Sequence, residues 1–211
     1  MEFGWVALWL VVVLALGAGA LPLATWLFPD RDQAPFAVAL ALAVVGVVAH
    51  LVGQVAFGIP AALAGVVVLL GLSALAGRRV DPDWRRAGEA AVVFVAAVLL
   101  IVALRSVDPS AAPLPLAIGE KFLDFGLLAS LERSTTLPPE DMWFAGETVR
   151  YYYGGHMLAS VLGTLAGTPP ALTYNLALAT FYGALVTAAY GLAGAIARPY
   201  RISRRVAAGL G

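Results

Sequence analysis

The segment at residues 147–158, ETVRYYYGGHML, concentrates hydrogen-bonding side chains beside an apolar run. Arginine and histidine are suited to a phosphate, and tyrosines can bind or stack against a sugar. The two glycines permit a tight chain reversal or the close approach of a ligand to the backbone. The tyrosines could equally be an interfacial anchor, because aromatic rings favour the headgroup level of a membrane. The binding candidates in this segment are Glu147, Arg150, Tyr151, Tyr152, Tyr153 and His156.

A second group of candidates lies in GEKFLDFGLLASLER, residues 119–133, which has the pattern of an amphipathic helix at the membrane surface. At 100° per residue, Glu120 and Asp124 fall on the same face as three leucines. A carboxylate on an apolar face is costly unless it is paired, bound to a metal or neutral. Alternatively, Gly126 breaks the helix and leaves Asp124 in water, where Lys121 neutralises it.

Between these two groups lies STTLPPEDMWFAGE, residues 134–147. The two prolines exclude regular helix and favour an extended chain. Glu140 and Asp141 follow the prolines and stand immediately before Met142, Trp143 and Phe144. Aromatic residues of this kind predict a position at the membrane interface.

The rest of the chain must hold these residues in a membrane. Hydrophobic residues make up 61% of the 211 positions and charged residues 12%, far from the proportions of soluble domains. Uncharged stretches of spanning length predict α-helices, because a helix needs about 20 apolar residues to cross the hydrocarbon. We therefore expect an all-α, polytopic transmembrane bundle of about six membrane helices, with one long extracytoplasmic loop that bears a juxtamembrane amphipathic helix. The stretches are 3–28, 34–77 (two helices), 171–197 and the shorter 90–104 and 154–168.

The positions of the basic residues indicate how the chain is oriented in the membrane. The segment GRRVDPDWRRAGE, residues 77–89, holds four arginines, so the positive-inside rule assigns it to the cytoplasm and the long loop to the outside of the plasma membrane. Four more arginines follow residue 197 and would lie outside if both last helices span. Either the helix at 154–168 is re-entrant or interfacial, or those arginines meet lipid phosphates.

The expected parts of the chain are a four-helix region at 1–104, the loop with the candidate active site at 105–155, and two further membrane helices at 156–211.

These motifs resemble a known family. EKxxDFxxL, PPxDxWxAG, YYYxGH and PPxxxYNLAL, in this order over residues 120–178, are similar to the signature of the YYY-motif (Chlor_Arch_YYY) family of uncharacterised bacterial and archaeal multi-pass membrane proteins. Members of that family are longer, so the resemblance implies that this chain is the N-terminal part of a longer protein.

The order of helices and loop also resembles, more distantly, the C superfamily of polyprenyl-phosphate-dependent glycosyltransferases. The resemblance implies that Asp124 is a general base or a ligand of a divalent cation, with Asp141 as the alternate. It assigns Lys121, Arg150 and His156 to a lipid phosphate and the tyrosines to a sugar. The expected catalytic residues are then Asp124, Glu120 and Asp141, and the expected substrate-binding residues are Lys121, Trp143, Glu147, Arg150, Tyr151, Tyr152, Tyr153 and His156.

Two hypotheses of function follow. In the first, the protein is a membrane enzyme that transfers a sugar from a polyprenyl-phosphate donor on the outer face, with Asp124 as the base. In the second, it is a non-catalytic transporter or scaffold in the assembly of cell-surface polysaccharide or lipid. The partners expected are membrane lipid and, for the enzyme, a lipid-linked sugar donor; no nucleic acid is expected. Beyond a divalent cation, no cofactor is indicated.

Overall fold

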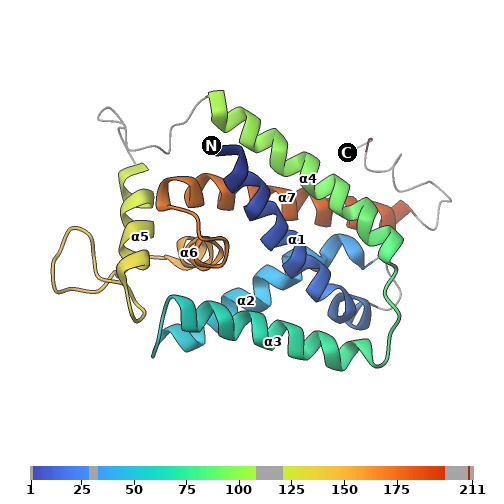
Figure 1. Ribbon diagram of the computed structural model, residues 1–211, viewed down its shortest axis with the longest axis horizontal. Helices are drawn as coiled ribbons and strands as arrows, with labels where there is room; N and C mark the ends of the chain where they lie inside the picture. The colour runs from blue at the N-terminus through green and yellow to red at the C-terminus, as the bar shows by residue number, and fades with distance from the viewer. Residues whose placement is uncertain (1, 29–32, 108–120, 198–208, 210–211) are drawn as a thin grey trace.

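The computed structural model describes residues 2–28, 33–107, 121–197 and 209 of the chain. Within them the regular elements are helices, joined by turns and one isolated pair of bridged residues (Figure 1). This confirms the all-α, polytopic class expected from composition. In chain order the elements are α1 (Glu2–Leu27), the 3-10 turn η1 (Ala34–Phe36), α2 (Ala37–Gly53), α3 (Ile59–Gly77), α4 (Trp84–Val107), α5 (Lys121–Arg133), α6 (Gly154–Ala166) and α7 (Pro170–Ala197).

Five helices in the described part are long and apolar enough to cross a membrane: α1, α2 together with η1, α3, α4 and α7. The expected sixth, at 154–168, is different. Its helix α6 has 13 residues and so extends about 20 Å, short of the hydrocarbon thickness of about 30 Å. In Figure 1, α6 is seen nearly end on while α3, α4 and α7 run across the view, so α6 lies across the direction of the bundle.

Backbone hydrogen bonds define one end of the bundle, which we call the loop end: the α2–α3 turn, α5, the segment 134–153 and the starts of α6 and α7. The amide of Phe57 donates to the carbonyl of Thr135 over 2.7 Å, and the amide of Leu137 donates to the carbonyl of Gly53 over 2.8 Å. These bonds attach the segment 134–153 to the turn between α2 and α3. The segment 134–153 is therefore hydrogen-bonded to the α2–α3 turn and is not held only at its two ends.

The opposite, tail end consists of η1, the start of α4 and the end of α7. The hydroxyl of Tyr190 on α7 donates to Glu89 on α4, and Gly191 lies against Pro35 of η1. Helix α7 therefore runs antiparallel to α4 and ends beside the arginine-rich α3–α4 connection. The sequence left two alternatives for the four arginines after residue 197. Those arginines lie outside the described residues, so the choice between the two alternatives stays open.

Small residues bring the helices of the bundle close together. A Cβ atom added to Gly183 on α7 would lie 2.7 Å from Val98 and 2.9 Å from Phe94, both on α4. Helices α2 and α3 approach in the same way at Gly65. In lipid, helix association relies on such close packing and on hydrogen bonds between helices. One of these bonds joins α1 to α7, because the indole of Trp9 donates to the hydroxyl of Thr180 over 2.8 Å in a buried position.

The close contact at Gly183 predicts that Gly183→Ala destabilises the protein. The added methyl must displace Phe94 or Val98, and overpacking of this kind costs about 1–3 kcal/mol. Gly71→Ala is the matched control, because a Cβ at Gly71 on α3 would meet nothing within 4 Å. Thermal unfolding in detergent should show a lower midpoint for Gly183→Ala only. Equal midpoints for the two variants would contradict the packing of α7 against α4.

Candidate functional site

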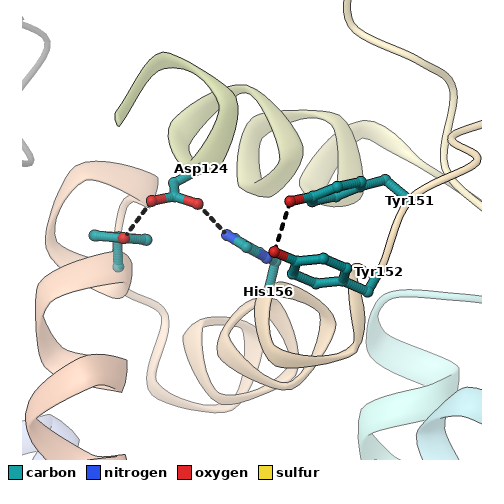
Figure 2. Close-up of polar contacts among 5 residues, drawn as sticks. Asp124, Tyr151, Tyr152 and His156 are labelled. Carbon is teal, nitrogen blue, oxygen red and sulfur yellow. Dashed lines mark hydrogen bonds and ion pairs between the residues drawn. The ribbon is translucent and has the colours of Figure 1, made fainter. Parts of the chain in front are cut away.

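The centre of the candidate site is the carboxylate of Asp124, which is shared between two helices. Its Oδ1 lies 3.1 Å from Nε2 of His156 on α6, and its Oδ2 accepts a hydrogen bond of 2.7 Å from the hydroxyl of Tyr174 on α7 (Figure 2). The side chain of Asp124 is 28% exposed and that of His156 17%. Three helices therefore meet at one partly buried carboxylate at the loop end.

The amphipathic pattern of α5 explains why Asp124 points into the protein. Leu127, Leu128 and Leu131 are fully buried, so the leucine face packs inward as predicted. Asp124 lies one turn earlier on this face and must find donors there. The alternative, a helix broken at Gly126, is wrong because α5 runs from Lys121 to Arg133 without a break.

The three tyrosines divide between two environments. The rings of Tyr151 and Tyr152 stack with centroids 4.0 Å apart, and the hydroxyl of Tyr151 donates to that of Tyr152 over 2.6 Å. The two residues are 45% and 76% exposed. Tyr153 is half-buried, with its ring centroid 6.5 Å from that of His50 on α2. Only Tyr153 packs into the bundle, and the first two form an exposed aromatic pair.

Gly154 and Gly155 form the start of α6. Neither has a positive φ angle, so the tight reversal anticipated from the sequence is not what these glycines provide. A Cβ atom at either position would meet nothing within 4 Å. The first turn of α6, where His156 also lies, therefore has open space beside it, and the close approach of a ligand to this backbone stays a prediction.

A polar groove of about 670 Å³ lies between the end of α5 and the segment 134–148. Trp143 lines it and is 64% exposed. The side chain of Arg133, also in the lining, forms no hydrogen bond or ion pair within the described part of the chain. The groove is lined by Ser130, Arg133, Ser134, Thr135, Thr136, Pro138, Glu140, Asp141, Met142, Trp143, Ala145, Gly146, Glu147 and Thr148.

Asp141, the alternate catalytic acid, shapes the wall of this groove. Its Oδ1 accepts hydrogen bonds from the amides of Trp143 and Phe144, at 2.8 and 3.2 Å. Glu140 similarly accepts from the amide of Gly146 over 3.0 Å. Such bonds stabilise a turn. The structure thus brings Asp124 and His156 together and gives Asp141 a separate role in the loop.

The remaining predicted site residues are either exposed at the surface or have side chains outside the described part of the chain. Glu147 and Arg150 form an ion pair at 3.7 Å with side chains 65% and 87% exposed, an arrangement that contributes little to stability. Glu120 lies outside the described residues, and so does the side chain of Lys121. No group of three histidines or acids that could hold a metal ion occurs among the residues that the structure describes.

Tyr174 is the site residue that sequence reasoning missed. No role was predicted for it from the sequence, although it is the tyrosine of the YNLAL motif. The bond to Asp124 joins residues 50 positions apart. The motif itself was the available signal, because a tyrosine at the start of a membrane helix can place its hydroxyl at the interface.

The bond between Tyr174 and Asp124 predicts that Tyr174→Phe destabilises the protein. Removing a donor to a charged acceptor costs about 1–3 kcal/mol. Tyr182→Phe is the control, because Tyr182 lies on the same helix, is 39% exposed and forms no hydrogen bond within the described residues. Thermal unfolding should show a lower midpoint for Tyr174→Phe and the wild-type midpoint for Tyr182→Phe. An unchanged midpoint for Tyr174→Phe would contradict the bond.

Glu132, near the end of α5, predicts a dependence of stability on pH. Partial desolvation raises the pKa of this carboxyl above its ordinary value of 4.5, although the side chain stays exposed on one side. The folded protein therefore keeps a proton that the unfolded chain has lost, and stability falls as the pH rises from 4.5 through the raised pKa. Glu132→Gln should match the wild-type melting temperature below this interval and exceed it at neutral pH. Parallel curves of melting temperature against pH would disprove the effect.

Comparison with known proteins identifies the family of the chain. No curated protein and no solved structure matches it. Residues 44–211 match the family described as "Uncharacterized membrane protein (DUF2298)", and this region includes Asp124, His156 and Tyr174. The YYY-motif name and the resemblance to glycosyltransferases stay predictions. Since the match covers most of the chain and five helices are long enough to span a membrane, the protein is an integral membrane protein that belongs to the DUF2298 family.

Proposed function

We propose that this protein is the membrane-embedded part of an enzyme that transfers a sugar from a polyprenyl-phosphate donor to an acceptor hydroxyl. The observation that carries the proposal is the position of Asp124. Its carboxylate lies at the loop end of the bundle, partly exposed and held by His156 and Tyr174. A reaction on a lipid-linked substrate requires an acid–base pair, here Asp124 with His156, at the level of the lipid headgroup, where the phosphate and sugar are found.

The proposed orientation puts the loop end on the outer face of the plasma membrane. The arginine-rich segment 77–89 belongs to the tail end of the bundle, where α7 also ends at Ala197. The positive-inside rule favours the cytoplasm for that end. The site would then serve the assembly of cell-surface molecules from donors presented outside the cell.

The loop end of the bundle supports separate places for the two substrates. The exposed pair of Tyr151 and Tyr152 offers a ring face and hydroxyls to a sugar, next to the open start of α6. Arg150, at the surface, is available to a phosphate. The polar groove, with Trp143 and several hydroxyl side chains, is suited to a polyhydroxylated acceptor.

A divalent cation has little support from the donor set. Both oxygens of Asp124 already accept hydrogen bonds, and Oδ1 of Asp141 accepts two more from the backbone. A cation at Asp124 would have to displace His156 or Tyr174. The proposal therefore uses no metal ion in any step.

A specific observation also favours the second candidate, a non-catalytic transporter or scaffold. Because both carboxylate oxygens are hydrogen-bonded, Asp124 could serve only to join α5 to α6 and α7. In that case the tyrosine pair is an anchor at the interface, and no sugar is transferred. Binding and turnover of a lipid-linked sugar distinguish the two candidates.

The enzyme proposal predicts that the purified chain retains a polyprenyl-phosphate-linked sugar in native mass spectrometry. Tyr151→Ala/Tyr152→Ala should weaken retention about tenfold, equivalent to about 1.4 kcal/mol, through loss of the ring faces. Tyr182→Ala, another exposed tyrosine, should retain the donor like the wild type. Asp124→Asn should bind the donor but release no polyprenyl phosphate when an acceptor sugar is added.

The contrary result is equally definite. If the wild type retains phospholipid but no lipid-linked sugar, and the tyrosine variant behaves in the same way, the scaffold or transporter is favoured. Retention of the sugar without any release of polyprenyl phosphate favours a transporter.

A further inference from the structure

The ring of His156 has one nitrogen that the cluster does not use. Nε2 lies 3.1 Å from Oδ1 of Asp124. An ionised carboxylate can only accept hydrogen bonds. Nε2 must therefore carry the ring proton and donate the hydrogen bond to Asp124. In the neutral ring the other nitrogen, Nδ1, then has a free lone pair.

The side of the ring that faces away from Asp124 is the side of the tyrosine pair. In Figure 2 the hydroxyl ends of Tyr151 and Tyr152 are directed toward His156, and Asp124 lies beyond the ring. The open space beside Gly154 and Gly155 belongs to the same first turn of α6. A sugar seated on the tyrosine pair would thus approach the histidine and not the carboxylate.

Asp124 itself is poorly arranged to accept a proton from substrate. Its two oxygens are engaged by Nε2 of His156 and by the hydroxyl of Tyr174. A substrate hydroxyl would have to displace one of these donors. An imidazole held by a carboxylate is, in contrast, a common general base, because the carboxylate selects the tautomer and stabilises the imidazolium that forms.

We propose that Nδ1 of His156 is the proton acceptor of the reaction, and that Asp124 and Tyr174 are positioning residues. This assignment rests on the sugar transfer proposed above. The acceptor oxygen forms a bond to the anomeric carbon, and the bond from that carbon to the phosphate oxygen breaks. The phosphate oxygen leaves with the electron pair as polyprenyl phosphate. The hydroxyl proton moves to Nδ1, and the resulting imidazolium keeps its Nε2–H bond to Asp124 until the Nδ1 proton passes to water.

The position of the proton can be measured without any substrate. The chain has two histidines, so histidine labelled with ¹⁵N gives two sets of ring signals, and His156→Gln assigns them. In the full chain in detergent, at a pH where the rings are neutral, His156 should show a protonated Nε2 and an unprotonated Nδ1. A protonated Nδ1 on neutral His156 would overturn the proposal whether or not the protein transfers sugar.

The positioning role of Asp124 has its own spectroscopic readout. Asp124→Ala removes the acceptor of Nε2–H, so His156 should change to a mixture of its two tautomers, while the signals of His50 on α2 stay unchanged. Tyr174→Phe, which leaves the carboxylate in place, should keep the Nε2–H tautomer. An unchanged tautomer in Asp124→Ala would remove Asp124 from the positioning role.

Turnover separates failure of this assignment from failure of the proposed function. His156→Gln should lower the release of polyprenyl phosphate about 100- to 10,000-fold, the usual contribution of a general base, while donor retention in native mass spectrometry is kept. His50→Gln should turn over like the wild type. A wild type that is active and a His156→Gln variant of equal rate would overturn the assignment alone. A wild type that releases no polyprenyl phosphate would overturn the proposed function, and this assignment with it.

Discussion

The loop end of this protein depends on one partly buried carboxylate. An ionised acid on the leucine face of a helix is costly unless donors replace the water that it loses. Asp124 obtains those donors from the first turn of α6 and from the start of α7. Because hydrogen bonds to a charged group are short and directional, this single residue holds α5 across the beginnings of the two helices that follow it.

The membrane-spanning helices provide the fixed frame for this arrangement. Helix α7 packs against α4 through Gly183 and is bonded to α1 through Trp9 and Thr180. In lipid such close packing is the main source of helix association, so α7 has little freedom to shift. The hydroxyl of Tyr174 is thereby presented at a constant place for Asp124. The close helix packing at Gly183 thus fixes the position of Tyr174 at the loop end.

The acidic residues have different roles because their carboxylates have different hydrogen-bond partners. Asp124 contacts ionisable and hydroxyl side chains from other helices, whereas Asp141 and Glu140 accept from backbone amides of their own turn. The first arrangement can take part in the movement of protons, and the second makes a loop rigid. A rigid loop is useful here, because it forms a wall of the polar groove and carries Trp143 on its rim.

The sequence by itself determined the all-α membrane class, the spanning helices and the amphipathic α5 with Asp124 on its inner face. These properties depend on the length and periodicity of apolar residues within one segment, and such local patterns can be read without knowing the fold. Only the tertiary structure decided that α6 is a short helix of 13 residues packed across the bundle, that Asp141 supports a turn, and that Tyr174 joins Asp124. The apolar run at 154–168 has the composition of a membrane helix, but its burial among α2, α3 and α7 comes from packing between segments. A pairing over 50 positions leaves no periodic trace in the sequence, because it depends on how the whole bundle folds.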